Sequence, residues 1–360
     1  MTPDTPTRRV LLTVSGRIPE DVLEAVAAGR RPRVDYLEMA AAFDADLLDH
    51  TEAARSAGLV GRVVAKVLGE NGRLAWRCHQ LRNRYDVIVT DGEQVGLPLA
   101  ALLWISRRRR ARHLMIVHIM STKPKTRLFR ALRLGARIDE VFVYATAQAD
   151  HIAQRLRYPR ERITLTPFMV DTAFFSPDNV ATSRSTPLVS SAGLEFRDYP
   201  TLVEAVRGLD VDVVLAAASP WSKRRSELDD MALPDNVEVV RLDLYQLRQL
   251  YADSTIVVMP LRETDFQAGI TTILEAMSMA KPLICTRTTG QTDTVADDQT
   301  GVYVPVGDPV AWRAAITDLL TDHDRADRLG SAARSWALAE ADLGRYTIRL
   351  AERVDAHRRR

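Results

Sequence analysis

The chain contains 360 residues, of which 46% are hydrophobic and 27% are charged, a composition typical of globular proteins with two domains. Its two cysteines, Cys78 and Cys285, lie far apart and match neither a disulfide framework nor a metal-binding pattern. No apolar run reaches about 18 residues, and the first residues lead directly into a strand-like segment without a secretory signal. We therefore expect a cytoplasmic protein with no membrane-spanning helix.

The net charge of +2 hides an asymmetry between the two halves of the chain. Residues 1–172 contain 28 Lys and Arg against 19 Asp and Glu, whereas the rest contains 21 against 28. Two basic runs, at 107–113 and 123–137, place cations beside apolar residues, a pattern that suits peripheral contact with the inner face of an anionic membrane. A solvated basic surface is the commoner explanation of such runs. Nucleic acid is not expected as a partner, because no aromatic residues interleave with the cations.

Short apolar runs alternate with helical patterns along the first half of the chain. Because these runs are continuously apolar, we expect strands buried on both faces, hence a parallel sheet covered by helices. The strands are predicted at 10–15, 86–90, 113–118, 140–145 and 163–167, and the helices between them at 44–56, 58–82, 94–106, 124–134 and 146–157.

After an irregular polar stretch the same alternation restarts. Six more strands are expected in LVSSAG, VDVVLAAAS, VEVVRL, TIVVMP, PLICT and GVYVPV, and the last fifty residues from Pro309 are helical. The pattern predicts two doubly wound, Rossmann-like α/β domains in series, whose ligands should bind at the carboxyl ends of the strands. The predicted boundaries are 1–172 for the first domain, 173–187 for the linker, 188–340 for the second domain and 341–360 for a terminal helix.

The stretch that follows the strand at 255–260 has the features of a phosphate site. Small residues, Ala268 and Gly269, open a helix there, so free backbone N–H groups and the positive end of the helix dipole would face a ligand. Thr271 and Thr272 add hydroxyl donors. Glu275, about one turn further on, could accept hydrogen bonds from the hydroxyls of a ribose. An ordinary strand-to-helix turn with a surface glutamate is the alternative.

These residues resemble those of a known family. The segment QAGITTILEAMSMAKPLI resembles the nucleotide-sugar signature of GT-B fold retaining glycosyltransferases of family 4, the glycosyl transferases group 1. Glu275 matches the second glutamate of that signature, and Gln267 occupies the position of the first. In the strand and helix that begin at 189, Arg197 stands where the family has a lysine that grips the diphosphate. Leu194 replaces the family's arginine after Gly193, so Arg262 is our candidate for the second phosphate cation.

The resemblance implies the GT-B fold, with two domains facing a central cleft and the terminal helix returning to the first domain. It implies a hexosyltransferase that moves a sugar from a nucleotide-diphosphate sugar, a UDP- or GDP-sugar, to an acceptor hydroxyl with retention and without a bound metal. The leaving diphosphate would be stabilised by Arg197 and Arg262. The implied donor-binding residues are Gly16, Gly193, Arg197, Gln267, Ala268, Gly269, Ile270, Thr271, Thr272 and Glu275.

The first domain would then bind the acceptor. HLMIVHIMSTKPK resembles a family strand that ends in a histidine, so His118 is our candidate for a catalytic residue that polarises a sugar hydroxyl or orients the acceptor. A structural role is the alternative for this histidine. Asp91, Glu93 and Lys123 are further candidates for acceptor contacts. No metal site is predicted, because the triplets beginning at Asp44 and Asp210 are expected at a helix start and just before a strand.

Two other functions stay open at this point. An epimerase that acts on the nucleotide sugar could use the same fold. Alternatively, with Gln267 at the position of the first glutamate and one phosphate cation missing, the chain could be a catalytically weak, nucleotide-sugar-binding partner of an active transferase. Dehydrogenase, ATPase, metalloprotease and α/β-hydrolase functions are disfavoured, since their sequence motifs are absent.

Overall fold

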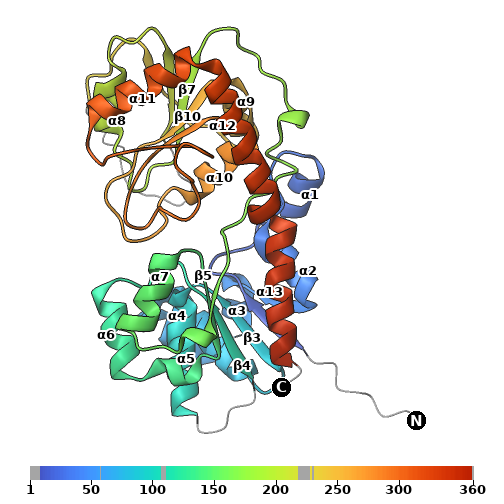
Figure 1. Ribbon diagram of the computed structural model, residues 1–360. Helices are drawn as coiled ribbons and strands as arrows, with labels where there is room; N and C mark the ends of the chain where they lie inside the picture. The colour runs from blue at the N-terminus through green and yellow to red at the C-terminus, as the bar shows by residue number, and fades with distance from the viewer. Residues whose placement is uncertain (1–8, 57, 107–110, 218–227, 229–230, 359–360) are drawn as a thin grey trace. The chain divides into compact units, whose positions relative to one another are not determined.

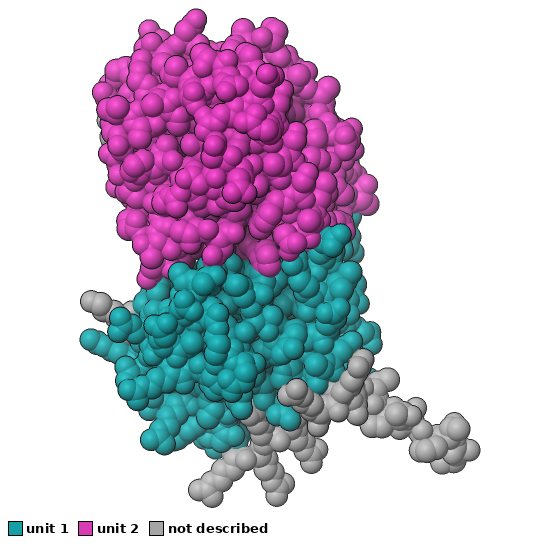
Figure 2. Space-filling model, viewed as in Figure 1, with its two compact units in different colours: residues 1–23, 34–166, 344–360 teal, residues 24–33, 167–343 magenta. Residues whose placement is uncertain are grey.

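The computed structural model describes residues 9–358, apart from 57, 107–110, 218–227 and 229–230. It divides into two compact units, coloured separately in Figure 2. The first comprises residues 1–23, 34–166 and 344–360, and the second comprises residues 24–33 and 167–343. Each unit contains one six-stranded parallel sheet flanked by helices (Figure 1). Within the described part of the chain, no helix is long and apolar enough to cross a membrane.

The sheet of the first unit has the strand order β2-β1-β3-β4-β5-β6, and every neighbouring pair is parallel. Strands β1, β4 and β5 are buried almost throughout, as their continuously apolar sequences predict. The strands are β1 Val10–Thr13, β2 Ala45–Leu48, β3 Val87–Asp91, β4 Arg112–Ile116, β5 Glu140–Val143 and β6 Ile163–Leu165. The helices are α1 Val22–Ala27, α2 Asp35–Phe43, α3 His50–Ser56, α4 Gly58–Leu81, α5 Glu93–Ile105, α6 Lys123–Ala131, η1 Leu134–Arg137, α7 Thr146–Asp150, η2 His151–Arg155 and η3 Arg160–Arg162.

The segment 44–56, predicted as one helix, contains an edge strand instead. Asp44 adopts a left-handed conformation, with φ 48°, and ends α2 by donating its N–H to the carbonyls of Ala40 and Ala41. Residues Ala45–Leu48 then pair with β1 as strand β2, and α3 begins only at His50. The prediction of a helix start at Asp44 was therefore wrong. An edge strand is buried less completely than a central one, so its sequence mixes polar and apolar residues. This mixture is why the sequence pattern did not predict β2 as a strand.

A buried carboxylate joins the last helix, α13 Leu343–Arg358, to the sheet of the first unit. The Glu140 side chain on β5 is only 2% exposed, and it accepts hydrogen bonds from Arg353, at 2.7 Å and 3.0 Å, and from Thr164. His357 Nε2 lies 2.7 Å from Glu140 Oε2. Burial tends to raise the pKa of Glu140, but the hydrogen bonds from His357, Arg353 and Thr164 outweigh burial and lower the pKa.

Glu140→Gln should destabilise the first unit by about 3 kcal/mol, because Arg353 and His357 lose the buried carboxylate to which they bond. The carboxylate of the native chain stabilises the folded state above its unfolded pKa, and this stabilisation is lost as the pH falls through its lowered folded pKa. Urea denaturation of the variant at neutral pH measures the effect. Asp150→Asn is the matched control, since Asp150 and Arg160 form an ion pair whose side chains are both about half exposed. An equal, small effect of both substitutions would contradict the prediction.

The sheet of the second unit has the order β12-β11-β10-β7-β8-β9, again parallel throughout. All six strands predicted from the second half of the sequence are present, and the residues from Pro309 to 358 form helices apart from short connections. The strands are β7 Leu188–Ala192, β8 Asp212–Ala216, β9 Val237–Val239, β10 Ile256–Met259, β11 Leu283–Thr286 and β12 Val302–Val304. The α-helices are α8 Tyr199–Val206, α9 Leu244–Asp253, α10 Ile270–Ser278, α11 Pro309–Thr321 and α12 His323–Trp336.

The two strand orders locate one switch point in each sheet. In the first unit the chain moves from β1 to one side and from β3 to the other, so the switch point lies between β1 and β3. In the second unit it lies between β7 and β10, for the same reason. Doubly wound sheets bind ligands outside the carboxyl ends of their strands at such points. The loops that follow β1, β3, β7 and β10 are therefore the places to look for sites.

Candidate active site

In the second unit, the loops after β7 and β10 meet at the switch point. Arg197 and Leu261 form an antiparallel bridge, and Asp198 N–H donates to the Pro260 carbonyl at 3.0 Å. Arg197 is only 9% exposed, and its guanidinium donates to the carbonyls of Ala192, at 3.0 Å, and Glu195, at 2.8 Å. Among the described residues, no carboxylate forms an ion pair with it. A buried cation with only neutral partners is a strong attractor for an anion.

Two glycines at this point allow other side chains to approach the backbone closely. Gly193 has φ +90°, and a Cβ there would lie 2.4 Å from Nη2 of Arg197. Gly269, with φ +74°, precedes α10, and its Cβ would lie 2.6 Å from the sulfur of Met259. No side chain caps the N-terminus of α10, so its first backbone N–H groups are left for a ligand.

Glu275 lies in the second turn of α10 and is not a surface residue. It is 5% exposed, and Tyr251 from α9 donates a 2.8 Å hydrogen bond to its Oε2. Burial raises the pKa of Glu275 to about 7, although the hydrogen bond from Tyr251 and the charge of Arg197 oppose this. Only Oε2 is used by Tyr251, so Oε1 can accept a further hydrogen bond. The alternative of a solvated glutamate is excluded.

The remaining predicted donor residues lie in the loop between β10 and α10 or at the start of that helix. Arg262 is exposed, and its backbone N–H donates to the Phe196 carbonyl at 3.0 Å. Gln267 is half-buried, and its amide donates to Thr294 while its Oε1 is buried without a partner. Thr271 is exposed on the first turn of α10, whereas Ala268, Ile270 and Thr272 are buried.

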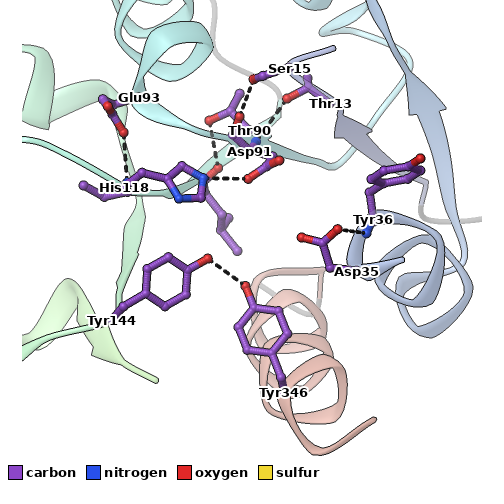
Figure 3. Close-up of polar contacts among 12 residues, drawn as sticks. Thr13, Ser15, Asp35, Tyr36, Thr90, Asp91, Glu93, His118, Tyr144 and Tyr346 are labelled. Atoms are coloured by element: carbon purple, nitrogen blue, oxygen red, sulfur yellow. Dashed lines mark hydrogen bonds and ion pairs between the residues drawn. The ribbon is translucent and has the colours of Figure 1, made fainter. Parts of the chain in front are cut away.

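In the first unit, Asp91 lies at the switch point and is held by the loop after β1. Its N–H donates to Thr13 Oγ1 at 3.1 Å, and its carbonyl accepts from Ser15 at 2.6 Å. The side chain of Asp91 lies 3.0 Å from Nε2 of His118, which follows β4 (Figure 3). Gly16 is half-buried in the same loop as Ser15, with open space where a Cβ would stand.

His118 is fixed by three polar groups. Besides its contact with Asp91, it donates its backbone N–H to Glu93 Oε2 at 2.9 Å and accepts at its carbonyl from Gln148 at 2.8 Å. Its side chain is 37% exposed, so part of it is open to solvent. Burial lowers the pKa of His118, but the hydrogen bond and charge of Asp91, with the charges of Glu93 and Asp35, outweigh burial and raise the pKa.

Glu93 is held inside the protein by a lysine two residues beyond the predicted one. Glu93 begins α5 with a side chain that is 1% exposed, and it accepts a 2.7 Å hydrogen bond from Lys125 on α6. Its carboxylate thus bonds both to Lys125 and to the backbone of His118. Lys123 is the first residue of α6, and its side chain lies outside the described residues.

Sequence reasoning missed three residues that converge on His118. Asp35 begins α2 beside the Asp91 and His118 pair, and Tyr144 after β5 donates to or accepts from Tyr346 of α13 at 3.1 Å (Figure 3). Burial and the charge of Asp91 raise the pKa of Asp35 to about 6, against the Tyr36 N–H and the charge of His118. The ring of His118 lies 5.7 Å from that of Tyr144. These residues come from distant parts of the sequence, so no local motif marks them.

A comparison with protein families shows which known proteins this part of the chain resembles. The profile described as "Glycosyl transferases group 1" matches residues 194–322, the segment that contains Arg197, Gly269 and Glu275. The second unit therefore carries a segment that matches the group 1 glycosyl transferases. This segment lies where the buried arginine and the uncapped helix meet.

Relatives with assigned activities match over most of this chain. A GDP-mannose-dependent α-(1-6)-phosphatidylinositol monomannoside mannosyltransferase from Mycolicibacterium smegmatis is 26% identical over 337 residues, covering 85% of this chain and 86% of its own. A D-inositol 3-phosphate glycosyltransferase from Xylanimonas cellulosilytica is 26% identical over 305 residues, covering 73% of this chain and 70% of its own.

Solved structures establish that the chain has the GT-B fold. A glycosyltransferase from Rickettsia africae superposes with a TM-score of 0.69 at 15% identity, covering 98% of this chain and 99% of that one. Anabaena HepE in complex with UDP-glucose also superposes with a TM-score of 0.69, at 16% identity, covering 97% and 99%.

Proposed function

We propose that the chain transfers a hexose from a nucleotide-diphosphate sugar to an acceptor hydroxyl with retention at the anomeric carbon. The observation that carries the proposal is the cation at the second switch point. Arg197 is buried with neutral partners only, close to Gly193. The uncapped N-terminus of α10 belongs to the same group of loops. A diphosphate would supply the missing anion and accept the free N–H groups.

Each donor-site residue has a defined task in this proposal. The guanidiniums of Arg197 and Arg262 stabilise the negative charge that accumulates on the leaving diphosphate, and no resident metal is assigned to that task. Oε1 of Glu275 accepts a hydrogen bond from a ribose hydroxyl while Tyr251 holds Oε2. The amide of Gln267, which keeps one buried oxygen without a partner, faces the transferred sugar. The departing diphosphate accepts the acceptor's proton.

His118 binds the sugar hydroxyls in the first unit. The contact with Asp91 favours the form that carries a proton on both ring nitrogens, in which Nε2 donates to Asp91 and Nδ1 donates to a substrate oxygen. Asp35 and Asp91 supply acceptors for hydroxyl protons beside it. This arrangement suits a polyol or sugar acceptor. The Mycolicibacterium and Xylanimonas relatives support GDP-mannose as a donor to test first and inositol-containing compounds as acceptors.

The transfer experiment combines GDP-mannose or UDP-glucose with inositol phosphate, phosphatidylinositol or a phosphatidylinositol mannoside, and follows the anomeric proton of the product by NMR. The proposal predicts an α-linked product from an α-linked donor, formed equally well in the presence of a chelator. An inverted product would overturn retention. Conversion of the donor to an isomeric nucleotide sugar without any acceptor would identify an epimerase. Donor binding without turnover at any acceptor would favour a binding partner protein.

We also propose that the protein contacts a membrane through its first unit. Of the two basic runs, residues 107–110 lie outside the described residues, whereas α6 exposes Leu128 and Leu132. The first half of α4 supports the proposal further. Its apolar side chains Leu59, Val60, Val63, Val67 and Leu68 are 54–75% exposed, and Gly58 and Gly69, both with positive φ, bound it.

Val63→Ser/Val67→Ser should weaken binding to anionic vesicles roughly tenfold or more, because two valine side chains no longer leave water. Co-sedimentation with phosphatidylglycerol vesicles measures the effect. Arg62 and Lys66 on the same helix remain in the variant, so the charge is unchanged. Val310→Ser/Ile348→Ser is the matched control, since these side chains are 76% and 58% exposed elsewhere. Equal sedimentation of the native chain and the α4 variant would contradict the contact.

A further inference from the structure

The first unit contains a pocket that none of the residues around His118 lines. It has a volume of about 440 Å³ and lies where α6, η1 and the segment 156–162 meet. These segments lead into the amino ends of β5 and β6, whereas His118 follows the carboxyl end of β4. The pocket therefore belongs to the opposite edge of the sheet and is separate from the proposed acceptor site.

The lining of this pocket is basic and contains no carboxylate. Four arginines contribute to it, Arg130, Arg133, Arg157 and Arg162, and all four are exposed. None of them forms an ion pair within the described part of the chain, in contrast to Arg160 nearby, which pairs with Asp150. Phe129 and Tyr158 form an apolar wall, with their rings edge to face at 6.2 Å. Unpaired guanidiniums around one concave site match the geometry of phosphate oxygens.

Two of these arginines stand where the backbone favours glycine. Arg133 follows α6 with φ 50°, and Arg157 follows η2 with φ 55°, so both end a helical segment in the left-handed conformation. Glycine is the usual residue at such positions, because a Cβ makes the conformation costly. The chain accepts this cost twice at one pocket, and each time the residue is a cation. Backbone strain of this kind accompanies functional sites.

We propose that this pocket binds a phosphate group, carried either by a soluble phosphate ester or by a lipid headgroup. The two pairs of guanidiniums would hold the phosphate oxygens, and the wall of Phe129 and Tyr158 would contact the apolar part of the ligand. The proposal does not depend on the transferase activity, because it involves no residue of the second unit and none of the group around His118.

The test uses Arg133→Gly/Arg157→Gly, which removes two charges and at the same time relaxes both left-handed residues. Its thermal midpoint should be equal to or higher than that of the native chain, so a loss of binding cannot be attributed to misfolding. Titration calorimetry with inorganic pyrophosphate should show one binding event of the native chain weakened tenfold or more in the variant. Arg55→Ala/Arg84→Ala, which removes the same charge from two exposed positions on α3 and after α4, should keep the native affinity.

A second arm identifies the source of the phosphate. Sedimentation is measured with phosphatidylcholine vesicles that contain phosphatidic acid, and with phosphatidylcholine alone. Binding of the native chain to the first but not the second, with loss in the glycine variant, supports a lipid headgroup. Binding of pyrophosphate without any vesicle difference supports a soluble ester. Should the glycine variant fold poorly, Arg130→Ala/Arg162→Ala replaces it. Pyrophosphate and vesicle binding that are unchanged in these variants would overturn the proposal.

Discussion

Glu275→Gln is expected to weaken binding of the nucleotide sugar by roughly 30-fold, which corresponds to about 2 kcal/mol for a hydrogen bond to a charged acceptor. The substitution keeps the shape of the side chain and leaves one oxygen for Tyr251. It removes the carboxylate that would accept a hydrogen bond from a ribose hydroxyl. Titration calorimetry with the donor measures the loss directly.

The same titration should depend on pH in the native chain. Because burial raises the pKa of Glu275 to about 7, the carboxyl is mostly protonated at pH 6 and mostly ionised at pH 8. Ribose hydroxyls bind the ionised form better, so donor affinity should increase about tenfold from pH 6 to pH 8. The diphosphate of the sugar donor is esterified at both ends and does not titrate in this range. In Glu275→Gln the dependence should disappear.

Tyr251→Phe provides the control for this prediction. It removes the hydrogen bond that lowers the pKa of Glu275, and it leaves the carboxylate in place. The pH at which donor affinity rises should therefore move upward, while the affinity at high pH should change little. If the glutamine variant bound the donor as tightly as the native chain, Glu275 would have only a structural role.

His118→Ala is expected to lower kcat by roughly a hundredfold or more, while donor affinity stays the same. The imidazolium donates from Nδ1 to the substrate, and the variant cannot. Because the pKa of His118 is raised above its ordinary value, the native chain should lose kcat as the pH rises through that raised pKa. Measuring kcat at saturating donor separates this loss of activity at high pH from the effect of Glu275 ionisation on donor binding.

Asp91→Asn tests the cause of the pKa shift. The hydrogen bond and charge of Asp91 raise the pKa of His118, so the asparagine variant should lose activity at a lower pH than the native chain. Asp150→Asn, at an exposed ion pair of the same unit, should leave the pH profile unchanged. A pH profile that does not move in Asp91→Asn would show that His118 has no titrating role in the reaction.

The sequence predicted the strands well because buried parallel strands are continuously apolar, a property that local residues determine. The sequence did not predict β2. This edge strand pairs with β1 alone, and its sequence mixes Asp46 with apolar residues. Helix ends were harder still, as Asp44 shows, because a left-handed cap depends on the backbone and not on a repeating pattern.

The candidate site was predictable only where a motif is contiguous. Gly269 and Glu275 lie in the segment that resembles the family's signature, and Arg197 lies in the separate family-like segment that begins at 189. The structure places Arg197 and Gly269 in the loops at one switch point. The partners that give these residues their chemistry come from elsewhere in the chain. Tyr251 is 24 residues from Glu275, and Tyr346 is 202 residues from Tyr144. Sequence alone could not pair them.

A thermal-shift screen against UDP, GDP, ADP and dTDP tests the central claim most directly, with Arg197→Ala examined alongside the native chain. A ligand at about 100 times its dissociation constant should stabilise the native chain by roughly 2.7 kcal/mol, a clear rise in the unfolding temperature. We predict that one of the four nucleotides produces this rise in the native chain and not in the variant. If none of them stabilises the native chain, or if Arg197→Ala responds equally, the switch point of the second unit does not bind a nucleoside diphosphate.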